Sequence, residues 1–277
     1  MKSRKKSFKP LNLLICLIIL IWSGGPILLI LLSSFKIPRE IFSYPPKLFF
    51  RPTLMNFRNL FSTWPQFSIS LINSLIITIF SAILTVSLSS LAGFAYSRYR
   101  SRTLQFSAFY LIVIRMLPPI VITIPLYPIA YALNLFDKHF LLIILYTAFF
   151  LGLGTILMKS FIDEIPIELD EVAYIDGASR FRVFISIILP LAKHGMMATS
   201  TFVIIFAWKE YFYALLFTTT KAKTAPLMIS EMMGSVTGVD WGPVFAAAMI
   251  QLLPILVFVY FIQKLLSKGI TLGAVKG

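Results

Sequence analysis

The sequence predicts an all-α polytopic membrane protein. Of its 277 residues, 58% are hydrophobic and the mean hydropathy is +0.87. Charged residues make up 13%, about half their share in an average soluble domain. The apolar residues form continuous runs rather than an alternating pattern, which is typical of membrane-spanning helices and not of the strands of a membrane barrel.

Six runs are long enough to cross a bilayer, given that a span needs about 20 apolar residues. We predict a single transmembrane domain over residues 1–277, with spans at about 12–34, 70–97, 105–133, 140–161, 191–217 and 243–265. The first run is uncleaved in this interpretation, because Pro10–Phe35 carries no charge, exceeds a signal-peptide core in length and precedes no small-residue cleavage site. The third run is expected to be irregular, since Pro118, Pro119, Pro125 and Pro128 each remove a backbone donor.

The basic residues predict the orientation of these spans. With the N-terminus inside, fifteen Lys and Arg lie on the inner side and nine on the outer side, although five of the nine fall in the first outer loop, 36–58. This bias places both termini and the loop 162–190 in the cytoplasm of a multi-pass protein of the cell (inner or plasma) membrane. The net charge of +14 comes from such flanks, so we expect the lipid bilayer and no nucleic acid as a partner.

Enzyme chemistry has few candidate groups in this sequence. The two histidines, His139 and His194, fall on opposite membrane faces in the six-span topology, so they cannot share a metal ion or a catalytic triad. There is no P-loop motif, and Cys16 is the only cysteine. We therefore expect no enzyme activity, catalytic residue, metal or cofactor in this chain.

The loop 162–190 interrupts the apolar pattern. Six of the eleven acidic residues lie between Asp163 and Asp176. The stretch "ELDEVAYID" predicts a short helix with acids near its positive end, Gly177 a stop, and Ser179 the cap of a following helix. Ala173, Gly177 and Ala178 would leave a smooth surface for close approach by another protein; a merely solvated loop is the alternative.

Residues Glu171 to Pro190 follow the pattern E-x-A-x-x-x-G-x(9)-I-x-L-P. This pattern resembles the EAA loop of the permease subunits of binding-protein-dependent ABC importers. Val172 replaces the usual second-position Ala. The stretches "NSLIIT" (73–78), "AGFAYSRYR" (92–100) and "LPPIVITIPLY" (117–127) also look like this family, as does "FAWKEYFYAL" (206–215), with Lys209 in place of the usual Asn. The tail "KGITLGAVKG" is similar to that of the carbohydrate-type, maltose-permease-like small subunit.

The resemblance implies the type I ABC importer permease fold, in which a cytoplasmic coupling helix lies between spans four and five. It also implies a subunit forming half of an uptake path for a sugar or oligosaccharide. Its partners would be a second, non-identical permease, two cytoplasmic ATPases that use ATP and magnesium, and an extracytoplasmic sugar-binding protein. Two alternatives stay open: an importer of another small polar solute, such as a glycerol-phosphate-type substrate, and a self-sufficient secondary transporter or channel.

Three groups of residues are candidates for functional roles under this resemblance. We expect Glu168, Asp170, Glu171, Ala173, Asp176, Gly177, Ala178 and Arg180 to couple to the ATPase, and Lys268, Gly269, Lys276 and Gly277 to contact it from the tail. The translocation path candidates are Arg115, Trp208, Glu210, Tyr211 and Gln251. Each path candidate has an alternative role in packing or helix cross-linking, but a charge within a span is a functional hypothesis by default.

Overall fold

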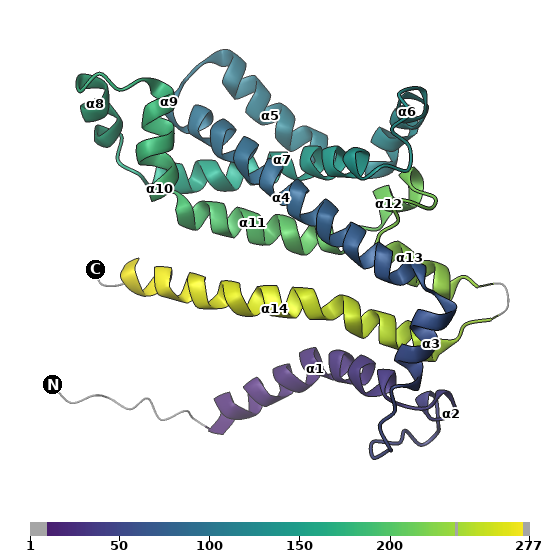
Figure 1. Ribbon diagram of the computed structural model, residues 1–277. Helices are drawn as coiled ribbons and strands as arrows, with labels where there is room; N and C mark the ends of the chain where they lie inside the picture. The colour runs from purple at the N-terminus through teal and green to yellow at the C-terminus, as the bar shows by residue number, and fades with distance from the viewer. Residues whose placement is uncertain (1–9, 236–237, 274–277) are drawn as a thin grey trace. The chain divides into compact units, whose positions relative to one another are not determined.

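A computed structural model describes residues 10–235 and 238–273 of the chain, with side chains for 12–114, 116–235 and 238–260 (Figure 1). Every regular element within these residues is a helix. The chain divides into two compact units, Met1–Ser68 with Ile229–Leu253, and Ile69–Met228 with Pro254–Gly277. The helical class predicted from the apolar runs is confirmed.

The first unit contains α1 (Pro10–Ser34), α2 (Pro38–Ile41), α3 (Met55–Thr63) and the start of α14 (Trp241–Gly273). The fully buried Asn56 of α3 holds the C-terminal end of α1. Its Nδ2 donates to the carbonyls of Ser34 and Lys36, at 2.9 and 2.7 Å. These bonds satisfy carbonyls at the end of α1 that would otherwise lack partners, and they tie the start of the following loop to α3.

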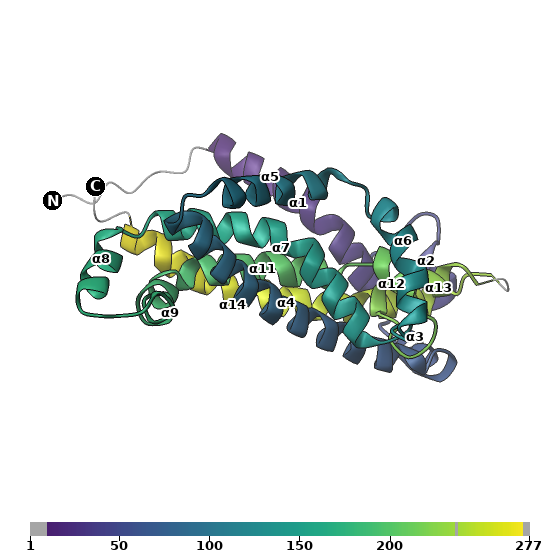
Figure 2. The same cartoon turned by 90° about the horizontal axis from the view of Figure 1, so that it is seen from above.

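The second unit is built around three long helices, α4 (Gln66–Arg98), α7 (His139–Asp163) and α11 (Lys193–Trp208) (Figures 1 and 2). Around them lie α5 (Arg102–Met116), α6 (Pro119–Ala132), α8 (Glu168–Ile175), α9 (Arg180–Val183), η1 (Phe184–Ile188), α10 (Leu189–Leu191), α12 (Phe212–Phe217) and the start of α13 (Ala225–Met233), whose remainder belongs to the first unit. At Gly154 of α7, an added Cβ would meet Ser89 of α4 and Thr199 of α11. Helix α7 therefore packs between α4 and α11 at close range.

Small polar residues form the surface with which α4 packs inside the second unit. Those buried along this helix are Ser70, Ser74, Thr78, Ser81, Thr85, Ser89 and Ser90. The Ser81 and Ser89 hydroxyls each lie 3.4 Å from a carbonyl oxygen of α7. Small and hydroxylated side chains let two membrane helices approach closely and hydrogen-bond. This explains why α4 is apolar on its exposed side yet rich in serine and threonine on its packed side.

Among the described residues, four helices are long and apolar enough to cross a membrane: Asn12–Ser34, Gln66–Arg98, His139–Asp163 and Trp241–Tyr260. Two bent pairs would bring the number to six. One is Arg102–Ile114 with Pro119–Ala132, bent by 98°, and it agrees with the irregular third span expected from the prolines. The other is Arg180–Leu191 with Lys193–Trp208, bent by 76°.

The segment predicted as the fifth span, 191–217, is not one continuous helix. The helix α11 ends at Trp208, residues 209–211 interrupt it, and α12 starts at Phe212. The Glu210 carboxylate accepts the backbone N–H of Tyr213 at 2.9 Å and so caps α12. No glycine or proline marks this break, which is why hydropathy alone missed it.

Candidate coupling site

The site consists of α8, the turn after it, and α9. Gly177 lies in the left-handed region, with φ of 79°. Its N–H donates to the Tyr174 carbonyl at 3.0 Å, and the Ala178 N–H donates to the Ala173 carbonyl at 2.9 Å. This pair of bonds is the Schellman motif that closes a helix with glycine. The Ser179 hydroxyl then accepts the N–H of Arg182 and caps α9, so the predicted helix, stop and cap are confirmed.

One side of α8 is held by residues elsewhere in the second unit. Arg98, at the end of α4, pairs through Nε with Asp170 Oδ2 at 2.8 Å and donates through Nη2 to the Ile165 carbonyl at 2.9 Å. The two charged side chains are only 7% and 3% exposed. Ala173 is 8% exposed and packs with Ile162 and Val183 in a hydrophobic cluster.

The smooth docking surface expected from Ala173, Gly177 and Ala178 therefore excludes Ala173, and Asp170 also faces inward. Both residues hold α8 against the rest of the second unit. Asp170 does so through its ion pair with Arg98, and Ala173 lies on the helix face that covers the hydrophobic cluster. Gly177 remains exposed and Ala178 is half-buried. Of the acidic candidates, Glu168, Glu171 and Asp176 are exposed.

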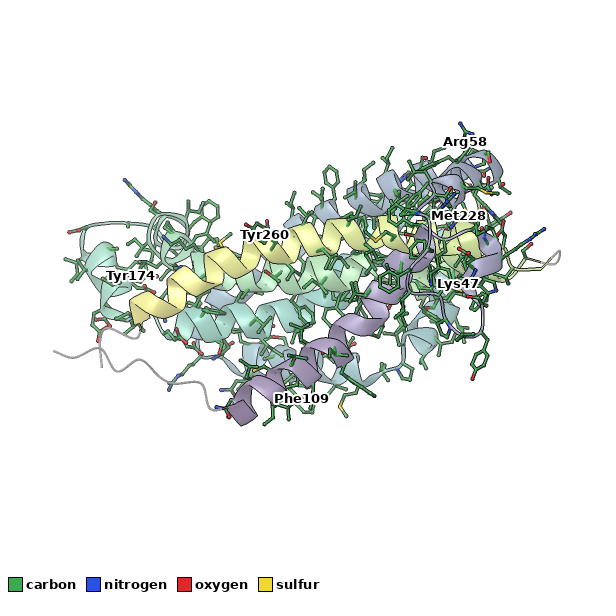
Figure 3. All side chains as sticks on the ribbon, turned by 90° about the horizontal axis from the view of Figure 1, so that it is seen from below. Lys47, Arg58, Phe109, Tyr174, Met228 and Tyr260 are labelled. Atoms are coloured by element: carbon green, nitrogen blue, oxygen red, sulfur yellow. The ribbon has the colours of Figure 1, made fainter. Side chains whose placement is uncertain are left out.

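The outward side of α8 is apolar as well as acidic. Val172 is 59% exposed, Ile175 is 85% exposed, and Phe181 of the following helix is 66% exposed. Sequence reasoning missed these three side chains, although apolar residues within a polar loop were a usable signal. Figure 3 labels Tyr174 on the same helix. Large apolar side chains that are exposed next to one another are typical of a surface that contacts another protein.

A second attachment fixes the start of α9. The guanidinium of Arg180 lies over the Tyr99 ring at 5.1 Å from its centre, and Tyr99 packs edge-on against Phe94. Burial, together with the neighbouring Tyr99 hydroxyl and Asp170 charge, raises the pKa of Tyr174 to about 12. The Tyr174 hydroxyl thus stays neutral at physiological pH. Arg180, predicted to couple to the ATPase, contacts this chain's own α4 end.

The path candidates fall in different places. Trp208 is 3% exposed, and Tyr211 is partly buried against the core of the second unit. The carboxylate of Glu210 caps the start of α12. Gln251 is half-buried on α14 in the first unit. The side chain of Arg115 lies outside the described residues, so the place of Arg115 in the path stays a prediction.

The tail candidates are only partly covered. The backbone of Lys268 and Gly269 is helical and belongs to α14. Their side chains, and the whole of Lys276 and Gly277, lie outside the described residues. Contact of the tail with an ATPase stays a prediction.

A polar cluster that sequence reasoning missed joins three segments on the predicted outer side. Asp137, at φ of 57°, accepts backbone N–H bonds from the residues of loop 219–222. Partial burial by itself would raise the pKa of Asp137, but the N–H donors of Lys221, Ala222 and Thr219 hold this pKa well below its usual range. The carboxylate therefore stays charged and ties the loop to the start of α7.

Asn73 extends this cluster to α4. Its Nδ2 donates to the carbonyls of Lys221 and Lys223 at 2.8 and 2.9 Å, and its Oδ1 lies 2.6 Å from His139 Nε2. The Ser74 hydroxyl accepts the N–H of Ala225 at 2.8 Å. Asn73 therefore links α4 to α7 and also holds the loop 221–223.

Residues 85–272 match the family model described as "Binding-protein-dependent transport system inner membrane component". The chain is 37% identical to a probable ABC transporter permease protein of Sinorhizobium fredii, covering 88% of this chain and 87% of that one. It is 34% identical to a trehalose/maltose transport system permease protein of Thermococcus litoralis, covering 95% and 93%.

Among solved structures, the chain resembles one from a bacterial ABC transporter involved in the import of the acidic polysaccharide alginate. The TM-score is 0.77 at 19% identity, covering 95% of this chain and 98% of the other, which shows a shared fold. Residues 85–272, which the family model matches, contain α8, α9 and most of the long helices. The chain therefore belongs to the family of inner-membrane permease components of binding-protein-dependent ABC transporters, which are transport subunits and not enzymes.

Proposed function

We propose that this chain forms half of the translocation path of an ABC importer for a sugar or oligosaccharide, with α8 as the coupling helix between spans four and five. In this proposal the chain has six spans, at about 12–34, 70–97, 105–133, 140–161, 191–217 and 243–265, and both termini are cytoplasmic. Support for the substrate class comes from the trehalose/maltose permease relative and from the carbohydrate-type tail.

The observation that carries the coupling role is the outward face of α8. Val172 and Ile175 are exposed beside the acidic Glu168 and Glu171, while the opposite face is anchored through Asp170. An apolar patch bordered by charge suits a groove with basic rims on a partner, because complementary charge orients the contact and burial of apolar area stabilises it. The partner of this surface is, in our proposal, one of two cytoplasmic ATPases.

A second permease is proposed to pack against the membrane-facing side of the second unit. A groove of about 370 Å³ lies between α4 and α11, lined by apolar and small side chains that include Ala82, Val86, Ser87 and Met196. Such lining lets a helix of another subunit approach closely. An extracytoplasmic sugar-binding protein would deliver substrate to the outer loops.

Purification through an affinity tag on this chain, from its native membrane, tests the proposal. We expect an ATPase and a second permease to co-purify, and the reconstituted complex to take up a labelled sugar such as trehalose or maltose only with ATP and a binding protein. Uptake by the chain alone, without ATP, would instead show a secondary transporter. ATP-dependent uptake of glycerol phosphate and no sugar would contradict the substrate class but keep the coupling role.

A further inference from the structure

We propose that α4 is the element that transmits movement of the coupling helix across the membrane, and that Arg98 and Asn73 are the positioning residues at its two ends. The inference rests on the proposed coupling role of α8. It goes further by naming the helix that carries the movement and the two side chains that attach it.

The inner attachment is a buried ion pair. Arg98 Nε and Asp170 Oδ2 are 2.8 Å apart, the two side chains are 7% and 3% exposed, and the second Arg98 nitrogen reaches the Ile165 carbonyl. Removing one member of a buried pair leaves an uncompensated charge, so such a pair is far harder to separate than a surface pair. Arg98 therefore makes α8 follow the end of α4.

An exposed ion pair on α7 contrasts with the buried Arg98–Asp170 pair. Lys159 and Asp163 of α7 form an ion pair whose side chains are 43% and 42% exposed, and exposed pairs contribute little. This pair lies at the same end of the second unit, since Gly93 of α4 packs directly on the backbone of Lys159. It provides a matched control for any loss of charge at that end.

The outer attachment is the Asn73 amide. Its Nδ2 donates to the carbonyls of Lys221 and Lys223, and the neighbouring Ser74 hydroxyl accepts the Ala225 N–H. These three bonds join the outer part of α4 to a loop about 150 residues further along the chain. Asn73 is 4% exposed and Ser74 is 3% exposed, so water competes little for the bonds.

Between the two attachments α4 is continuous. The 26 residues from Asn73 to Arg98 extend about 37 Å at helical rise, roughly the thickness of a bilayer. Within the four described helices long enough to span, α1 contains Pro26 and α14 contains Pro254, whereas α4 and α7 contain no proline. Since sharp kinks arise mainly at proline, α4 can carry a displacement from one end to the other.

Helix α4 also contacts α7 near both of its ends. A Cβ added at Gly93 would lie 2.8 Å from the Lys159 backbone nitrogen, so the two helices are in backbone contact near the inner end. Near the outer end, Asn73 faces His139 of α7. A chain of packed and hydrogen-bonded groups thus runs from Asp170 to the loop 221–225, which is the kind of contiguous network that can carry coupling between distant sites.

The experiment places a reporter in the outer loop of the complete transporter, purified through this chain and reconstituted in lipid. In a Cys16→Ala background, Lys221→Cys presents a thiol at an exposed position, and its reaction rate with a water-soluble maleimide is measured without nucleotide and after trapping with ATP and vanadate. We expect the two rates to differ in the unaltered complex. We expect Arg98→Gln to remove that difference and to reduce uptake about tenfold, while basal ATP hydrolysis persists.

Rescue separates a positioning role from a merely structural one. The exchange Arg98→Asp with Asp170→Arg should restore the nucleotide-dependent difference, and Lys159→Gln should leave it unchanged. Asn73→Ala alters only the far end, so it should remove the difference at the reporter without reducing ATPase binding. This variant also tests the inference if Arg98→Gln fails to assemble.

The inference is overturned if the rate difference survives in Arg98→Gln or in Asn73→Ala, or if the unaltered complex shows none. Failure of the proposed function has another signature: no ATPase would co-purify with the unaltered chain. The two failures are therefore distinguishable in a single preparation.

Discussion

Replacement of Gly177 tests whether the turn after α8 docks on another subunit. At φ of 79°, a side chain other than glycine is strained, but a Cβ built at this position meets nothing within 4 Å. A Cβ at this position therefore clashes with nothing in the chain, and the backbone cost is about 1–2 kcal/mol. That is a small part of the roughly 5–15 kcal/mol by which proteins are typically stable, so the variants should insert and fold.

The series Gly177→Asn, Gly177→Ala and Gly177→Trp separates backbone strain from volume. Asparagine tolerates the left-handed region, so Gly177→Asn should transport nearly as the natural protein does. Gly177→Ala should show a modest loss. Gly177→Trp adds a large side chain at an exposed turn, and we expect normal membrane amounts but lost sugar uptake and lost stimulation of ATP hydrolysis.

The measurement compares co-purified ATPase, stimulated ATP hydrolysis and uptake for each variant. Gly238→Trp is the matched control, because Gly238 has φ of 98° and open space around it but lies in the predicted outer part of the chain. It should leave ATPase co-purification unchanged. If Gly177→Trp keeps normal ATPase stimulation and uptake, the docking argument is refuted.

Three further predictions concern other parts of the second unit. Asp137→Asn should loosen the loop 219–222 and lower stability by about 1–3 kcal/mol, seen as faster amide exchange there. Because the folded pKa of Asp137 is depressed, the stabilisation by its carboxylate is fully present above the unfolded pKa and is lost as pH falls through the folded pKa. The difference in free energy of unfolding between the natural protein and Asp137→Asn should therefore stay constant from pH 7 to about pH 5. A steady decrease of this difference over that range would contradict the proposed role of Asp137 in holding the loop 219–222. Gly93→Ala should cost about 1–3 kcal/mol of thermal stability, because its Cβ would meet the Lys159 backbone, whereas Gly24→Ala, with nothing within 4 Å, should not destabilise. Cysteine placed singly at Arg115, Glu210 and Tyr211 in a Cys16→Ala background should react with a water-soluble thiol reagent at one position at least, and no reaction in either resting or nucleotide-trapped complexes would remove these residues from the path.

Local sequence determined the elements whose causes are local. Continuous apolar runs set α1, α4, α7 and α14, because a bilayer requires about 20 apolar residues in one helix. The helix, stop and cap of 168–182 were equally predictable. A Schellman turn at Gly177 and a hydroxyl cap at Ser179 depend on residues no more than five positions apart.

Partnerships between distant residues were beyond such reasoning. The side of α8 that faces inward is decided by Arg98, which is 72 residues from Asp170, so composition suggested a docking role for a carboxylate that the fold buries. The hydrogen bonds from the loop 219–222 to Asp137 join residues more than 80 positions apart. The break at residues 209–211 likewise has no marker in hydropathy, because Glu210 stabilises it through a cap that forms only once the chain turns. Hydropathy and capping act between near neighbours in the chain, whereas the pairing of buried charges depends on which helices the tertiary structure brings together.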